Sequence, residues 1–145
     1  MSGSDELLGH WYLDSWTGVD GEGRPITHGG DEPQGDLIYL PSGRMAVQIQ
    51  HDGRDPFGDR ALEAGSPTER AIAYSTYNAY CGTFSVPEPG VVVHHVELAI
   101  HPDQPGMDKR RDYVLEGDRL TLKTQDVETE NGTATSELNW RRRDP

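Results

Sequence analysis

Alternating hydrophobic and polar residues along most of the chain predict β-strands. Successive side chains of a strand point to opposite faces, so one apolar face repeats at every second residue. The segments "DLIYL" (36–40) and "RMAVQIQH" (44–51) follow this pattern, and the turn sequence "PSG" between them predicts a hairpin. The segment 7–19 predicts a short helical turn that leads into a long strand, and further strands are predicted at 83–87, 90–101, 109–116, 118–125 and 133–143. The pattern therefore indicates about eight strands.

One segment, 66–82, predicts an α-helix instead. It begins with the residues of a capping box that has proline at the first helical position: Ser66, Pro67 and Glu69. Gly82 can end the helix in the left-handed conformation. A helix over about 66–81 would place Tyr77 and Tyr80 on one face.

The connections between the strands predict an up-and-down antiparallel sheet. Short turn sequences, "EPG" (88–90), "EGD" (116–118) and "ENG" (130–132), join several neighbouring strands. Closing such a sheet into a barrel removes its unpaired edges. Eight strands enclose a lumen that holds side chains or one small ligand. We therefore expect an all-β, eight-stranded up-and-down antiparallel β-barrel with one α-helix, in a single domain over 1–145 with a flexible terminus at 1–6.

Several motifs resemble a known family. The sequence "GHW" (9–11) resembles the Gly-x-Trp signature of lipocalins. The segments "GDLIYLPSGRMAVQI", "AYCGTFSV", "VVVHHVE", "RRDYVLEGDRLTLKT" and "LNWRR" are similar to those of the bacterial and fungal lipocalin-like domain family, and the resemblance covers 7–143. It implies a calycin-type barrel with a small-molecule cavity, in which Trp11 plugs the closed end and packs against Arg141 or Arg142. It implies no catalytic residue.

Composition narrows the range of partners. The chain has 25 acidic and 13 basic residues and a formal net charge of -12, which disfavours nucleic acid as a partner. Cys81 is the only cysteine, so no internal disulfide can form and a reducing cytoplasm is expected. Neither a signal peptide nor an apolar run of about 20 residues is visible, so no membrane partner is expected. A homodimer is left open.

The segment "VVVHHVELAIHP" (91–102) places ionisable residues in a strand. One face contains Val91, Val93, His95, Glu97, Ala99 and His101, and the other contains Val92, His94, Val96, Leu98 and Ile100. In the simpler interpretation, the second, more apolar face points into the barrel, and His95 and Glu97 lie in water. In the alternative, the first face points inward, because polar groups are common in ligand cavities.

The alternative gives a specific hypothesis for the site. His95 and Glu97 would act as acid and base, since imidazole has an ordinary pKa near 6.5. The ligand-binding side chains would come from several elements: Tyr39, Tyr77, Tyr80, Arg111 and Tyr113. An arginine nearby would offset the cost of burying the carboxylate.

Other kinds of chemistry lack their motifs. His95, Glu97 and His101 share a face, but their spacing matches no zinc pattern, so no metal is expected. No glycine-rich phosphate loop and no G-x-S-x-G elbow is present, so no cofactor and no serine hydrolase chemistry are expected. Two functions remain for a small hydrophobic or amphipathic ligand. One is a cofactor-free isomerase or cyclase of secondary metabolism, favoured slightly by the ionisable lining, and the other is a carrier or sensor.

Overall fold

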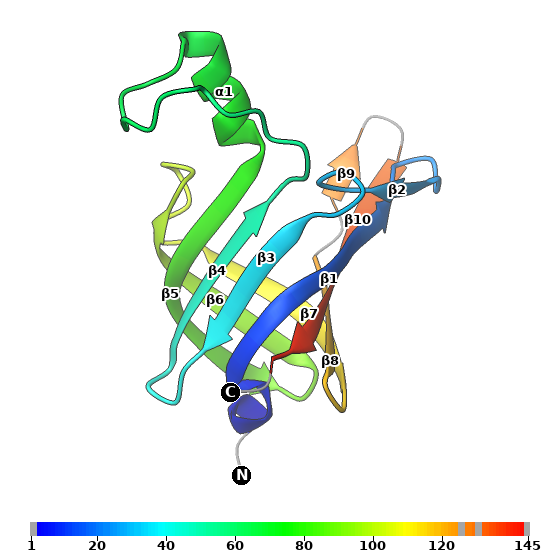
Figure 1. The fold of residues 1–145 in the computed structure, drawn as a ribbon. Coiled ribbons are helices and arrows are strands. Elements are labelled where there is room, and N and C mark those ends of the chain that lie inside the picture. The colour runs from blue at the N-terminus through cyan, green and yellow to red at the C-terminus, as the bar shows by residue number, and fades with distance from the viewer. Residues whose placement is uncertain (1–2, 125–126, 130–131, 144–145) are drawn as a thin grey trace.

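The computed structural model describes residues 3–124, 127–129 and 132–143, which form a closed antiparallel barrel of eight strands (Figure 1). The elements follow one another along the chain as η1 (Gly3–Leu7), β1 (Gly9–Val19), β2 (Pro25–Thr27), β3 (Gln34–Tyr39), β4 (Arg44–Gln50), α1 (Pro67–Ser75), β5 (Tyr77–Glu88), β6 (Val91–Ala99), β7 (Asp108–Glu116), β8 (Arg119–Lys123), β9 (Val127–Thr129) and β10 (Gly132–Arg142).

The barrel closes because its first and last long strands pair. Neighbouring strands are hydrogen-bonded in the order β2-β1-β3-β4-β5-β6-β7-β8-β10-β9, and β1 also pairs with β10. The short strands β2 and β9 pair with the ends of β1 and β10 that project beyond the barrel wall. The predicted lipocalin-like up-and-down barrel with one helix is confirmed.

The core consists of the alternate, inward-facing residues of the wall strands. The largest fully buried side chains are Trp11, Trp140, Tyr39, Leu7, Leu37, Leu120, His94 and Val92. Each Å² of apolar surface removed from water contributes about 25 cal/mol to the free energy of folding. The shared interior is therefore the main source of stability. Apart from tyrosine and tryptophan, His94 is the one polar residue among the buried side chains of the described chain.

One end of the barrel is closed by the N-terminal helix. The indole Nε1 of Trp11 donates a hydrogen bond of 2.9 Å to the carbonyl oxygen of Leu7. The guanidinium of Arg142 lies 4.2 Å from the centre of the Trp11 ring and donates to the carbonyl oxygens of Glu6 and Leu8. The expected partner of Trp11 is therefore Arg142. Figure 1 shows η1 at this end and α1 at the opposite end.

The helix is shorter than the sequence predicts. Its capping box between Ser66 and Glu69 forms as expected, but the helix ends at Ser75. Residues from Tyr77 onward form β5, which pairs with β4 on one side and β6 on the other. Two ladders of backbone hydrogen bonds outweigh the local helical pattern, as tertiary context often does. Gly82 is therefore a strand residue rather than a helix stop.

A β-bulge between β5 and β6 changes which residues face inward. Gly82 pairs with Val96 and Cys81 pairs with Leu98, so Glu97 is the extra residue of the bulge. Beyond the bulge, Ala99 packs against the core and Leu98 is exposed. The strict alternation expected over the whole of 91–101 is therefore wrong after Val96.

Candidate ligand site

A histidine held between two tyrosines is the main polar feature inside the barrel. His94 on β6 is 2% exposed. Its Nε2 lies 2.6 Å from the hydroxyl of Tyr39 on β3, and its Nδ1 lies 2.6 Å from the hydroxyl of Tyr80 on β5. Each of the three residues occupies an inward position of its strand, so the barrel itself brings them together.

Burial keeps these three side chains uncharged. Removal from water lowers the pKa of His94 to about 3, with further lowering by the positive charges of Arg111 and Lys109 and by His95. Burial also raises the pKa of Tyr80 to about 12 and that of Tyr39 well above its ordinary value. At neutral pH the cluster is therefore a neutral imidazole between two protonated phenols.

Two basic side chains from the inner face of β7 lie beside this histidine. Lys109 pairs with His94 across the ladder, and its ammonium lies 4.2 Å from the centre of the Tyr80 ring. Its Nζ donates a hydrogen bond of 2.8 Å to Gln104. Burial, followed by the charge of Arg111, lowers the pKa of Lys109 to about 8. The lumenal cluster consists of Tyr39, Tyr80, His94, Lys109 and Arg111.

Two tryptophans face the rest of the interior, which is largely apolar. Trp140 pairs in register with Leu13 and Leu120, and Trp16 pairs with Leu138. The indole Nε1 atoms of both tryptophans are buried and have no hydrogen-bond partner among the described residues. Unpaired buried donors are uncommon in native proteins, so each is a position where an acceptor atom of a ligand could bind.

His95 and Glu97 lie on the outside of the barrel. His95 is hydrogen-bonded to Ser85 and Asp108, each at 2.8 Å, and Glu97 accepts two hydrogen bonds, of 2.9 and 3.0 Å, from Arg44. The expectation that both point into the lumen is wrong, because the face of β6 with Val92 and His94 points inward. Their catalytic role stays a prediction. Neither side chain forms a hydrogen bond with the lumenal residues described above.

The predicted ligand-binding residues separate into two groups. Tyr39, Tyr80 and Arg111 belong to the lumenal cluster, and Tyr113 on β7 is also buried and bonded to Glu6. Tyr77 lies on the other side of the wall. Residues three apart share a face in a helix but lie on opposite faces in a strand, so the loss of the helical turn separates Tyr77 from Tyr80.

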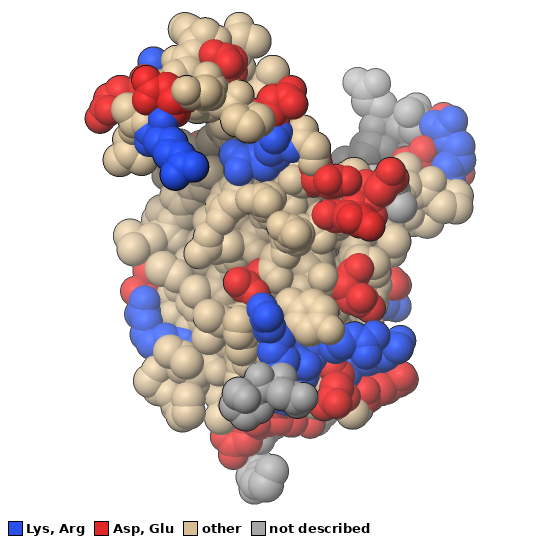
Figure 2. Space-filling model, in the orientation of Figure 1, with Lys and Arg blue, Asp and Glu red and all other residues tan. Residues whose placement is uncertain are grey.

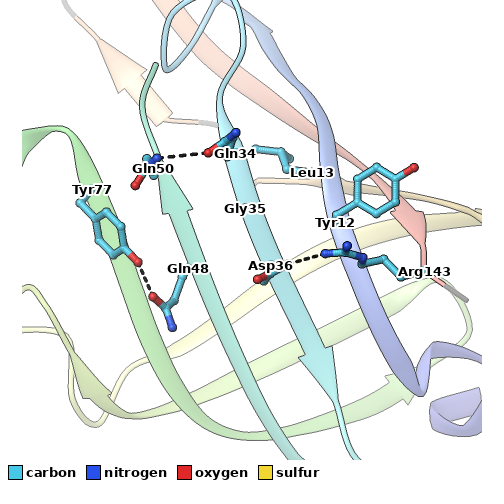
Figure 3. Close-up of a pocket in the computed structure, with 9 residues that line it drawn as sticks. All are labelled: Tyr12, Leu13, Gln34, Gly35, Asp36, Gln48, Gln50, Tyr77 and Arg143. Atoms are coloured by element: carbon cyan, nitrogen blue, oxygen red, sulfur yellow. Dashed lines mark hydrogen bonds and ion pairs between the residues drawn. The ribbon is translucent and has the colours of Figure 1, made fainter. Parts of the chain in front are cut away.

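Tyr77 lines a hollow on the outer surface instead. The hollow has a volume of about 470 Å³, and Figure 3 shows polar side chains of β1, β3, β4 and β5 around it. Tyr77 donates a hydrogen bond to Gln48 there, and Gln50 donates to Gln34 at 3.2 Å. A second hollow, of about 670 Å³, lies between α1 and the residues after β4 and includes Phe57 and Ile72 in its lining. Neither hollow contains a member of the lumenal cluster.

Sequence reasoning missed His94 and Lys109 as site residues. The signal for His94 was present, because it alternates with Val92 and Val96 on the more apolar face of its strand. A histidine between two buried valines needs hydrogen-bond partners inside the core. Lys109 shares the parity of Arg111 along its strand, so the argument that placed Arg111 inward applies to both.

The described residues offer neither a metal site nor a membrane-spanning helix. Among them, no group of three or more histidine, cysteine, aspartate or glutamate side chains is arranged to hold a metal ion. The helices described in the structure are too short or too polar to span a bilayer.

Comparison with known proteins agrees with this architecture. Residues 8–143 match the family described as the lipocalin-like domain. The chain is also 29% identical over 106 residues to the 4'-hydroxy-3'-methoxypropiophenone carrier protein ppsC of Aspergillus oryzae. That similarity covers 68% of this chain and 96% of the Aspergillus protein.

Proposed function

The chain belongs to the lipocalin-like domain family, and from this premise we propose that it is a carrier for small aromatic molecules with a polar oxygen. The ligand would lie in the barrel lumen with its polar end at the lumenal cluster. The observation that supports this proposal is the buried imidazole of His94, held between two tyrosine hydroxyls and beside two cations. A few polar groups within apolar walls are the usual composition of a small-molecule site.

The relative from Aspergillus supports the same class of ligand. Its name describes a carrier for an aryl ketone with one hydroxyl and one methoxy group. Such a molecule has an aromatic ring that can pack against an apolar wall, and oxygens that can accept hydrogen bonds from the protein. The proposal transfers this ligand class, rather than the particular compound, to the present chain.

A cofactor-free isomerase or cyclase is the second candidate. Its support is the juxtaposition of imidazole and phenol groups, which can transfer protons in enzymes. A histidine whose pKa is about 3 is nevertheless a weak base at neutral pH, because proton transfer to it is then unfavourable. We therefore favour the carrier over the enzyme.

Tryptophan fluorescence provides a direct test of binding. The wild-type protein is titrated with 4'-hydroxy-3'-methoxypropiophenone, and we expect saturable quenching with one site per chain. Tyr80→Phe removes one hydroxyl from the lumenal cluster and should weaken binding about fivefold to tenfold, which corresponds to about 1 kcal/mol. Tyr74→Phe, an exposed residue of α1, is the matched control and should bind like the wild type.

Chromatography of the recovered ligand separates the two candidates. A carrier returns the compound unchanged after prolonged incubation, whereas an isomerase or cyclase converts it. If conversion occurs, His95→Ala and Glu97→Gln test the sequence-based assignment, which requires both to abolish turnover. Unsaturable quenching, or equal affinity of the two tyrosine variants, would contradict the lumenal carrier.

A further inference from the structure

The lumenal cluster has one hydroxyl proton more than its own acceptors can bind. A neutral imidazole has one N–H group and one bare nitrogen. One tyrosine hydroxyl therefore donates to the bare nitrogen of His94, while the other accepts the N–H. The accepting tyrosine keeps its own hydroxyl proton, and neither hydroxyl has a second acceptor among the described residues. This count holds for both tautomers, so the lumen always contains a spare O–H donor.

The two cations of the cluster also lack an anionic partner. Neither Lys109 nor Arg111 forms an ion pair with a carboxylate in the described part of the chain, although Arg110 between them pairs with Glu88 on the outer face. Instead, Lys109 and Arg111 repel each other in a partly buried position. Uncompensated charge in such a position is unfavourable, and a bound anion would relieve it.

The two lumenal cations lack a carboxylate partner within the described structure, in a protein that is rich in carboxylates. The chain has 25 acidic residues against 13 basic ones, so carboxylates are abundant. Figure 2 shows acidic and basic side chains interspersed on the outer surface, where ion pairs such as Arg44–Glu97 form. Among the described residues, no carboxylate is hydrogen-bonded or ion-paired to a member of the lumenal cluster. An acidic protein therefore presents donors and positive charge to its lumen.

We propose that the lumenal cluster is an oxyanion site, which binds a phenolate or carboxylate oxygen of an aromatic ligand through the spare tyrosine hydroxyl and the charges of Lys109 and Arg111. The inference rests on the proposed carrier function and specifies the charge of its ligand. A carboxylate enters already ionised. A phenol releases its hydroxyl proton to bulk water on binding, and the phenolate oxygen then becomes the acceptor of the tyrosine O–H.

Absorbance distinguishes these states, because a hydroxyaryl ketone absorbs at longer wavelength as its phenolate than as its phenol. We expect the pKa of protein-bound 4'-hydroxy-3'-methoxypropiophenone to be at least one unit below that of the free compound. This shift corresponds to at least tenfold preference for the anion over the neutral form. The analogue whose hydroxyl is methylated cannot ionise and should bind at least tenfold more weakly than the phenolate.

Two arginines on opposite faces of β7 provide matched variants. Arg111→Gln removes an inward charge and should reduce the pKa shift of the bound probe, whereas Arg110→Gln removes an outward charge and should leave it unchanged. An aryl carboxylate of similar size forms a second arm. If it binds with dependence on Arg111 while the hydroxyketone stays protonated, the oxyanion of the natural ligand is a carboxylate.

Failure of the oxyanion site and failure of the carrier function give different results. If the hydroxyketone binds with an unshifted pKa and neither its methyl ether nor the carboxylate differs from it in affinity, the oxyanion site is excluded while the carrier survives. If none of the three probes binds the folded wild-type protein, the carrier proposal fails and the oxyanion site with it. The comparison of probes on the wild type does not depend on any variant folding.

Discussion

At the scale of the residue, burying one imidazole determines what its neighbours must be. His94 is buried in the core, so its two nitrogens need hydrogen-bond partners from other strands. Tyr39 and Tyr80 supply these partners, and their rings add apolar contact at 5.6 and 5.7 Å between centroids. The same burial makes the neutral histidine the favoured form in the folded protein, so the stability of the fold depends on pH.

The folded state should lose stability as the pH falls, because of His94. Its pKa is about 3 when folded and near 6.5 when unfolded, so below pH 6.5 the unfolded chain binds a proton that the folded chain does not. This contribution to stability is complete above pH 6.5 and decreases by about 1.4 kcal/mol per pH unit toward pH 3. Between pH 6.5 and pH 5, the loss from this residue is about 2 kcal/mol.

Urea unfolding at several pH values measures this contribution. His94→Phe removes the titrating group and should flatten the pH dependence by that amount. It should also cost about 1–3 kcal/mol at pH 7, because two buried hydroxyls lose their partner. Tyr80→Phe keeps the imidazole buried and should retain most of the slope. An unchanged slope in His94→Phe would show that the folded protein protonates this histidine as readily as the unfolded chain does.

At the scale of the element, the bulge between β5 and β6 depends on the absence of a side chain at Gly82. A Cβ atom at this position would overlap the carbonyl oxygen of His95 and lie 3.0 Å from the backbone nitrogen of Glu97. The backbone φ of Gly82 is not in the left-handed region, so the constraint comes from close approach of two strands. The same bulge turns Ala99 inward beside Tyr80.

Gly82→Ala should therefore destabilise the barrel by about 3 kcal/mol or more, since backbone atoms on β6 must move. Gly53→Ala is the control. Gly53 has a φ of 74° but nothing within 4 Å of an added Cβ, so only the left-handed strain of about 1–2 kcal/mol is expected there. Chemical denaturation of both variants gives the comparison. Equal losses would mean that the strands separate easily enough to accept the methyl group.

The element scale also shows which predictions a sequence supports. Alternation predicted the strands around 36–40 and 44–51, because one face of each is buried and the other is in water. The helix start at Ser66 was predictable from local capping chemistry. The helix end was not, since pairing of Tyr77 and the residues after it with two distant strands decides their conformation. Nor does the local pattern reveal the bulge, which depends on the register of two strands.

At the scale of the whole molecule, closure of the barrel determines which face of each strand points into the lumen. Arg111 and Tyr39 were predictable as interior residues from the parity of their strands. His95 and Glu97 were misplaced because their face also contains valines, and a single strand gives no reference for the lumen. Closure provides that reference, because one face of all eight strands must surround the same core. The closed end fixes this arrangement through contacts between the two ends of the chain.

Two neighbouring arginines of β10 test how much the closed end contributes. Arg142 faces the N-terminal helix, stacks on Trp11 and donates to the carbonyl oxygens of Glu6 and Leu8. Arg141 faces outward and approaches Asp14 at 3.6 Å with both side chains partly in water. Arg142→Met keeps an apolar chain against Trp11 but leaves two carbonyl groups without their donor, so it should cost about 2–3 kcal/mol. Arg141→Met should cost less than about 1 kcal/mol, because exposed ion pairs contribute little.

Hydrogen exchange locates the effect within the molecule. In Arg142→Met, the backbone amides of residues 3–8 and the indole N–H of Trp11 should exchange faster than in the wild type, because η1 loses its attachment to β10. Amides of the β4–β5 pairing, on the other side of the barrel, should change only by the global loss of stability. If Arg141→Met and Arg142→Met were equally stable and exchanged alike, η1 would be held by Trp11 packing alone. Closure of the barrel would then depend on the β1–β10 ladder rather than on the arginine that joins the two ends of the chain.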